Sequence, residues 1–227
     1  MLSMSKIEKQ LRLGLDALKI ECDNEQVQDC LLVLEQLLFW NKKINLTAIT
    51  KPSEVVTKHL LDSLAMLPIL LETKNRVEVS QFRVLDVGTG AGFPALPLAI
   101  FTNDIRYFPL DSNSKKLAFI RRVANQLKLT NIQTVHSRIE DHQPSEPYQL
   151  ITARAFADLN NLMDWLPKEC ISKDAYLLAM KGKYPEDELA QYFGSKREQL
   201  WKLIDSVPIR VPGLEAERCL LRFKAIA

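Results

Sequence analysis

The stretch RVLDVGTGAGFPALPLAI, from Arg83 to Ile100, decides the fold of this chain. Its apolar run VLDV is followed at once by Gly88, Gly90 and Gly92. A short apolar run closed by glycines is typical of a strand that is buried on both faces of a sheet. Glycines directly after such a strand allow the backbone to approach a ligand closely. The stretch therefore predicts a strand, a ligand-binding turn and a helix that begins in PALPLAI.

Strand and helix patterns alternate beyond this stretch. We predict strands at 105–111, 131–141, 148–156, 175–182 and 218–226, and helices at 114–129 and 158–170. Such alternation requires right-handed crossovers, which give a mainly parallel sheet with helices on both faces. Ligands of these sheets bind at the carboxyl ends of the strands, which is where the glycines lie.

The part of the chain before this α/β pattern is predicted to be helical. Apolar residues recur at helical spacing after Asn24, an expected N-cap, and again after Pro52 at a first-turn position. His59 and Asp62 stand three residues apart on one helix face, where a structural role and a substrate role are both open. The polar stretch 72–81 marks a junction. We therefore divide the chain into an N-terminal helical region, 1–72, packed on an α/β domain, 73–227.

Composition excludes several classes of protein. Of 227 residues, 47% are hydrophobic and 26% charged, with a formal net charge of +2 that by itself indicates neither a nucleic-acid nor a membrane partner. Four cysteines and three histidines show no metal-ligand spacing, so we expect no metal. No apolar run reaches the roughly 18 residues of a membrane span, and the first residues lack a signal peptide. We expect a cytoplasmic protein with reduced thiols; the sequence indicates no oligomeric state.

The acidic residue before the glycines indicates which ligand the turn holds. Asp86 opens the pattern D-x-G-x-G-x-G, and a carboxylate there favours a cationic ligand such as S-adenosylmethionine, which carries an ammonium and a sulfonium. Two alternatives compete: a turn without a ligand, and the NAD fingerprint G-x-G-x-x-A in GAGFPA. That fingerprint begins at Gly90, after the turn has opened, and Pro94 stands where its helix would approach the pyrophosphate. We therefore favour S-adenosylmethionine over NAD.

Further acidic residues follow the next two predicted strands. Asp111 can accept two hydrogen bonds from ribose hydroxyls, and Glu140 or Asp141 can accept one from the adenine amine, with Ile139 covering the ring. One acidic residue near each successive strand end is more specific than a glycine pattern alone. The sequence thus predicts that 73–227 is a methyltransferase domain with a Rossmann-like, S-adenosylmethionine-dependent fold. Its predicted cofactor residues include Asp86, Gly88, Gly90, Gly92 and Asp111.

The sequence also resembles a known family. The segments WNKKINLT, HLLDS, DVGTGAGFPALPLAI, LDSNSKKLAFI, ARAFADL and MKGK stand in the order and spacing of the glucose-inhibited division protein B family, over the chain from about Leu32 onward. The resemblance implies methylation of guanine N7 in 16S ribosomal RNA, at nucleotide 527 of the 530 loop. It implies cofactor contacts at these residues: Gly88, Phe93, Ile139, Glu140 and Arg154. Naked 16S RNA and an assembled small ribosomal subunit particle are both open as the partner.

The chemistry is narrowed by what the chain lacks. Methyltransferases acting on exocyclic amines often carry N-P-P-Y or D-P-P-Y after the fourth strand, where this chain reads ARAF. Methylation of pyrimidine C5 needs a cysteine nucleophile, often after proline, and no cysteine here follows proline. Guanine N7 has a free lone pair at neutral pH, so alignment suffices and we nominate no catalytic residue. Another nucleic-acid methyltransferase, a non-catalytic nucleotide-binding protein and an NAD-linked protein stay open as alternatives.

Basic residues supply the case for an RNA substrate. No acidic residue interrupts positions 112–139, and the basic residues of the predicted helix largely face outward. Our candidates for RNA contacts are Lys115, Lys116, Arg121 and Arg122, with a merely solvated helix face as the alternative.

Two further side chains end predicted strands on the ligand side. Lys181 is a candidate for a phosphate contact or a solvated lysine. Arg154 can hold the cofactor carboxylate, as the resemblance implies, or the guanine edge, or form a salt bridge to Asp86 or Glu140.

Overall fold

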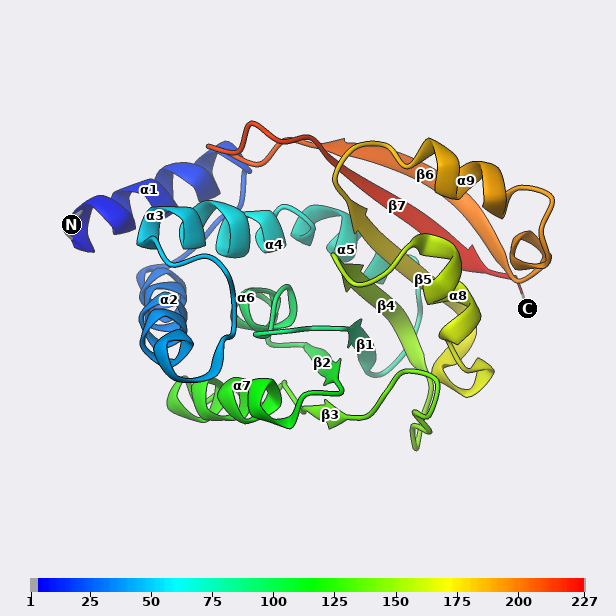
Figure 1. The fold of residues 1–227 in the computed structure, drawn as a ribbon, viewed down its shortest axis with the longest axis horizontal. Helices are drawn as coiled ribbons and strands as arrows, with labels where there is room; N and C mark the ends of the chain where they lie inside the picture. Colours follow the sequence, from blue (N-terminus) through cyan, green and yellow to red (C-terminus); the bar gives the residue numbers. More distant parts are fainter. Residues whose placement is uncertain (1–3, 227) are drawn as a thin grey trace.

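One seven-stranded sheet forms the centre of the molecule, as the computed structural model of the chain shows for residues 4–226 (Figure 1). The strand order is β3-β2-β1-β4-β5-β7-β6. Strands β1 to β5 pair in parallel, whereas β7 runs antiparallel to both of its neighbours. The strands are β1 (Phe82–Val87), β2 (Ile105–Asp111), β3 (Val135–His136), β4 (Tyr148–Arg154), β5 (Ile171–Lys181), β6 (Trp201–Ile209) and β7 (Arg218–Ala225). The predicted α/β class with a mainly parallel sheet is confirmed.

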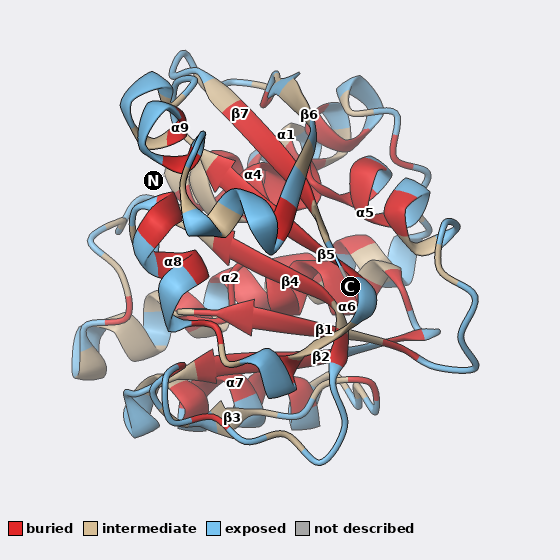
Figure 2. Cartoon of the chain, turned by 90° about the vertical axis from the view of Figure 1, so that its right-hand side faces the viewer, coloured by how far each residue is buried: buried red, intermediate tan, exposed pale blue. Residues whose placement is uncertain are grey.

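Helices cover both faces of this sheet, and the central strands β1, β2 and β4 between them are mostly buried (Figure 2). One face carries the N-terminal helices together with α6 (Ala95–Phe101) and α7 (Ser114–Gln126), and the other carries α8 (Leu159–Trp165) and α9 (Glu186–Tyr192). The N-terminal helices are α1 (Met4–Ala17), α2 (Asn24–Ile44), α3 (Pro52–Val55), the π-helix η1 (Val56–Leu61), α4 (Asp62–Leu64) and α5 (Leu67–Lys74). Two short 3-10 helices are η2 (Lys168–Cys170) and η3 (Lys196–Gln199).

Each face of the sheet has its own hydrophobic core, and the side chains of β1 contribute to both. Val84 packs with the N-terminal helices, while Leu85 and Val87 pack with α8 and α9, since successive side chains of a strand point to opposite faces. The first core joins residues of the N-terminal helices to residues of the sheet. The proposed division at 72 and 73 stays a prediction. None of the helices within residues 4–226 has the length and apolar character needed to cross a membrane.

Some predicted details are wrong. Helix α2 is capped by Asp23 and not by Asn24, because the Asp23 carboxylate accepts from the backbone N–H of Gln26 in a capping box while Asn24 is already helical. Of the predicted strand 131–141, only the two residues of β3 form a strand in the structure. Strand β6 and helix α9 were not predicted. Strand β6 lies at the sheet edge and is half exposed, so its sequence lacks the continuous apolar run of a buried strand.

Candidate active site

The glycine turn after β1 is held by the end of β2. All three of its glycines have positive φ values, 65° at Gly88, 59° at Gly90 and 88° at Gly92, a region that disfavours other residues. The Gly90 N–H donates to the carboxylate of Asp111 at 3.0 Å. Nothing lies within 4 Å of the place where a Cβ of Gly90 would stand, so its backbone faces open space. Gly92 differs, because a Cβ there would meet Leu96 at 2.6 Å.

A cavity of about 510 Å³, called the cofactor cavity below, opens beside this turn at the carboxyl ends of β1, β2 and β4. Four of the predicted cofactor residues line it together: Gly88, Asp111, Ile139 and Glu140. Asp111 also accepts from the Asn113 N–H at 2.8 Å, which fixes its carboxylate at the rim. Of the two acidic candidates after the third strand, it is Glu140 that lines the cavity.

Asp86 lies under the turn, with a residue exposure of 1%. Its Oδ1 accepts from the Thr152 hydroxyl at 3.0 Å, across the paired strands β1 and β4, and hydrogen bonds from the Thr89 side chain and the Ala95 backbone also favour the charged carboxylate. Burial raises the pKa of this carboxyl to about 6. A buried carboxylate under an open glycine backbone favours a ligand that carries a positive charge. These features match S-adenosylmethionine.

Phe93 packs behind the turn against the N-terminal helical region. Its ring stacks on the imidazole of His59 with centroids 4.7 Å apart, and His59 Nε2 is hydrogen-bonded to the Thr47 hydroxyl at 2.8 Å. Burial first, and then the positive charge of Arg154, lower the pKa of His59 to about 4, so the imidazole is neutral at pH 7. His59 therefore has a structural contact with the turn, from the π-helix η1.

A second cavity of about 270 Å³ adjoins the first, because both are lined by Ala155 and Phe156. Arg154 lines this second cavity, not the cofactor cavity, and its salt bridge runs to Asp62 at 2.7 Å and not to Asp86 or Glu140. Asp62 also accepts from Arg218 at 2.6 Å. One buried carboxylate thus joins two arginines in the cavity wall.

Lys181 also lines the second cavity, with a side chain only 15% exposed. Its ammonium donates to the Ala157 carbonyl at 3.0 Å and to Glu188 at 2.7 Å. The alternative of a solvated lysine is therefore wrong, and its contact with RNA phosphate stays a prediction.

The basic helix α7 presents most of its cations to solvent. Lys115, Arg121 and Arg122 are exposed, and Lys116 is half-buried with its ammonium 4.0 Å from the Asp111 carboxylate. The Arg122 guanidinium lies over the ring of Trp40 on α2, 5.0 Å from its centroid. Within residues 4–226, no three His, Cys, Asp or Glu side chains gather to hold a metal ion.

Comparison with known proteins decides which family has this site. Residues 26–216 match the family described as rRNA small subunit methyltransferase G. The chain belongs to that family. It is 35% identical to ribosomal RNA small subunit methyltransferase G of Psychromonas ingrahamii over 98% of this chain and 100% of the relative. It is 42% identical to the protein of that name from Aeromonas salmonicida, over 90% of each chain.

Solved structures agree on the fold of this family member. The tRNA (m1A58) methyltransferase of Aquifex aeolicus has a TM-score of 0.55 at 14% identity, covering 74% of this chain and 69% of that one. The ribosomal protein L11 methylase of Lactobacillus delbrueckii subsp. bulgaricus has a TM-score of 0.52 at 17% identity, covering 72% and 77%. The predicted family, Rossmann-like fold, methyltransferase activity and S-adenosylmethionine cofactor are confirmed, as is small-subunit ribosomal RNA as the class of substrate.

Sequence reasoning missed three residues of the site. Arg218 falls in a predicted strand that was not assigned to the ligand edge; because β7 is antiparallel, its first residues meet the carboxyl end of β5. Thr152 is paired in register with Asp86, so both side chains lie on the same side of the sheet. Phe156 stands in the quoted ARAF segment, and only the shared cavity lining marks it.

Proposed function

We propose that this protein transfers a methyl group from S-adenosylmethionine to N7 of a guanine in 16S ribosomal RNA, at nucleotide 527 of the 530 loop, without a general base. The observation that carries this proposal is the pair of adjoining cavities at the carboxyl edge of the sheet. A cofactor in the first and a base in the second would meet at Ala155 and Phe156, where both cavities are lined. Such an arrangement converts two bound reactants into one aligned pair.

The titratable groups around the second cavity are consistent with direct transfer of the methyl group without a general base. When bound, the cofactor supplies an electrophilic methyl group on a sulfonium. Guanine N7 bears no proton, so the protein has only to align the two and exclude water. Both carboxylate oxygens of Asp62 accept from arginines, and the Lys181 ammonium is bonded to Ala157 and Glu188. These engaged groups suit positioning better than proton transfer.

An RNA-binding surface beside these cavities fits the contacts of α7 with α2. Arg122 of α7 lies over Trp40, and Lys43 of α2 lies over Trp40 and the exposed ring of Phe39, at 4.9 Å and 4.6 Å. Cations and an exposed aromatic ring from two segments therefore form one surface, as single-stranded RNA sites require. We propose that this surface and α7 bind the 16S RNA, as naked RNA or in a small-subunit particle, in the cytoplasm.

Methyl transfer from labelled cofactor to small-subunit particles that lack the modification tests the reaction. Digestion to nucleosides should place the label in 7-methylguanosine of 16S RNA. Single-turnover rates at saturating cofactor should lack a rising limb between roughly pH 6 and 8.5, since no proton has to be removed. Label in an exocyclic amine or a hydroxyl, or a steep rise abolished by changing one titratable residue, would overturn the assignment to N7.

The salt dependence of RNA binding tests the surface. Changing Lys115, Lys116, Arg121 and Arg122 together to glutamine should weaken binding and flatten the slope of log affinity against log salt. The slope should change by about 0.7 for each single-strand phosphate that the protein no longer neutralises. A matched control changes the exposed Lys6, Lys9, Lys19 and Lys202. An equal effect of both variants would show that α7 is only a solvated face.

A further inference from the structure

We infer that the ring of Phe156 is the surface on which the target guanine stacks, and that the second cavity receives this base. The inference rests on the proposed function and adds the residue that holds the acceptor. Phe156 follows β4 directly and lines both the cofactor cavity and the second cavity. A group that contacts both reactants is best placed to set their distance.

The position of the Phe156 ring depends on a glycine. A Cβ added to Gly88 would stand 2.0 Å from Phe156 Cδ2, so the ring lies directly on the glycine turn. Only a residue without a side chain leaves room for it there. The ring therefore touches the cofactor turn and packs edge to face on Trp165, with ring centroids 6.0 Å apart, while 37% of Phe156 stays exposed.

The backbone that carries the ring is fixed on both sides. Ala155 has a φ of 52°, a left-handed conformation that is costly for alanine and persists only where neighbouring contacts impose it. On one side Arg154 is bonded to Asp62, and on the other the Ala157 carbonyl accepts from Lys181. Backbone strain of this kind clusters at ligand-binding positions.

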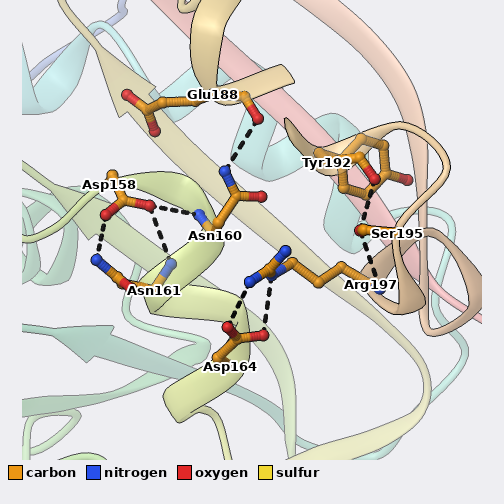
Figure 3. Close-up of polar contacts among 8 residues, drawn as sticks. All are labelled: Asp158, Asn160, Asn161, Asp164, Glu188, Tyr192, Ser195 and Arg197. Atoms are coloured by element: carbon orange, nitrogen blue, oxygen red, sulfur yellow. Dashed lines mark hydrogen bonds and ion pairs between the residues drawn. The ribbon is translucent and has the colours of Figure 1, made fainter. Parts of the chain in front are cut away.

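Helix α8 follows this turn and is hydrogen-bonded to α9 (Figure 3). The Asp158 carboxylate caps α8 by accepting from the backbone N–H groups of Asn160 and Asn161. The Asn160 side chain donates to the Glu188 carbonyl at 3.0 Å, and the Glu188 carboxylate accepts from the Leu159 N–H. The ring is thus presented by a rigid turn. A rigid, exposed aromatic ring is a stacking platform for an unpaired base.

The polar groups of the second cavity favour guanine among the bases. Arg154, Lys181 and Arg218 line it with donors, and the one carboxylate in its wall, Asp62, already accepts from both arginines. Guanine presents the acceptors O6 and N7 along one edge, whereas adenine replaces O6 with a donor amine. Donors in this wall therefore accept O6 of guanine and reject the adenine amine, while N7 stays free of hydrogen bonds so that its lone pair can attack the methyl group.

Substitution of Phe156 by residues of similar bulk isolates the stacking contact. Phe156→Leu removes the aromatic face, and Phe156→Trp keeps one. For a short RNA with the 530 loop, we expect Phe156→Leu to weaken binding and slow single-turnover methylation by roughly tenfold, which corresponds to about 1.4 kcal/mol of base stacking. Phe156→Trp should stay within about threefold of wild type. Because both variants keep an apolar side chain beside the cofactor cavity, the affinity for S-adenosylmethionine, measured by calorimetry, should change less than the affinity for RNA.

A fluorescent base gives a readout that does not depend on activity. In an RNA with a fluorescent pteridine analogue of guanine, which keeps the carbonyl at the O6 position, in place of the target guanine, stacking on Phe156 should quench fluorescence with wild type and Phe156→Trp, and not with Phe156→Leu. Phe193→Leu, at an exposed aromatic residue after α9, serves as the control and should behave as wild type.

The outcomes separate this inference from the proposed function. Normal methylation and normal quenching by Phe156→Leu would overturn the inference while leaving guanine N7 methylation intact. A loss of cofactor affinity in Phe156→Leu as large as the loss of RNA affinity would also overturn it, because the ring would then serve mainly the cofactor. If wild type methylates a different RNA, the proposed function fails, and quenching of the analogue in the 530 loop should then be missing in every variant. Methylation of a different atom of the same guanine would overturn the assignment to N7 and leave the quenching unchanged.

Discussion

Arg154 at the end of β4 donates to the carboxylate of Asp62 in the N-terminal helical region at 2.7 Å, and Arg218 at the start of β7 donates to the other oxygen of the same carboxylate. The Asp62 side chain is only 2% exposed. This ion triad joins three segments that are far apart in the sequence. It forms part of the wall of the second cavity, so it connects the helical region to this cavity.

Removal of the Asp62 carboxylate should destabilise the fold. Asp62→Ala leaves two partly buried arginines without their anion, and we expect the free energy of unfolding in urea at pH 7 to fall by about 3 kcal/mol. The exposed pair between Lys74 and Asp104 provides the control, since Asp104→Ala should cost less than about 0.5 kcal/mol. Equal losses for the two variants would contradict a stabilising role of the triad.

Substitution of Gly90 should abolish cofactor binding through steric closure. Gly90→Val places a branched side chain in the open space of the turn, where we expect the ligand to approach the backbone. Gly194→Val is matched to it, because Gly194 also has a positive φ, 75°, with nothing within 4 Å. Both variants should carry a similar backbone strain, but only Gly90→Val should lose S-adenosylmethionine in calorimetry. Full binding by a folded Gly90→Val protein would show that the cofactor does not lie at this turn.

The pKa of Asp86 predicts a pH dependence of stability. Burial raises this pKa from 3.8 to about 6 in the folded protein, so the neutral carboxyl favours folding at low pH. That contribution is fully present below about pH 4 and is lost as the pH rises through 6. Relative to wild type without cofactor, Asp86→Asn should therefore gain up to about 3 kcal/mol between roughly pH 4 and 7.5. Urea unfolding of both proteins at several pH values measures this gain. If the free energies of unfolding of wild type and Asp86→Asn change in parallel with pH, the pKa of Asp86 is not raised.

The same substitution should weaken the cofactor complex. An asparagine at this position would leave no charge for the ammonium, so the affinity for S-adenosylmethionine at about pH 7.5 should fall although the protein is more stable. Calorimetry with wild type and Asp86→Asn at that pH separates the two effects. Unchanged affinity would show that the charge of the Asp86 carboxylate does not act on the ligand.

Substitution of Lys181 distinguishes a structural role of this residue from a contact with RNA. Lys181→Met breaks the bonds to Ala157 and Glu188 and should lower the free energy of unfolding by about 1–2 kcal/mol. Because the ammonium is committed to these partners, the salt slope of RNA binding should not change. A slope reduced by about one would instead identify Lys181 as a phosphate contact.

Much of the cofactor side of this site was predictable from sequence. Asp86, the glycines and Asp111 lie at the ends of apolar runs, and parallel strands bring such ends to one edge whatever the details of packing. Gly88, Asp111, Ile139 and Glu140 accordingly line one cavity. The resemblance added Arg154, which the structure places in the adjoining cavity.

The contacts in the wall of the second cavity depend on tertiary structure alone. Asp62 pairs with Arg154 and Arg218 across 92 and 156 residues of chain. Nothing in the periodicity around any of the three indicates a partner, because an ion pair depends on how helices dock on a sheet and on the direction of the last strand. Local patterns encode elements and their ends, since those follow from backbone hydrogen bonds and side-chain alternation. Which distant side chains meet at those ends depends on the packing of the whole core.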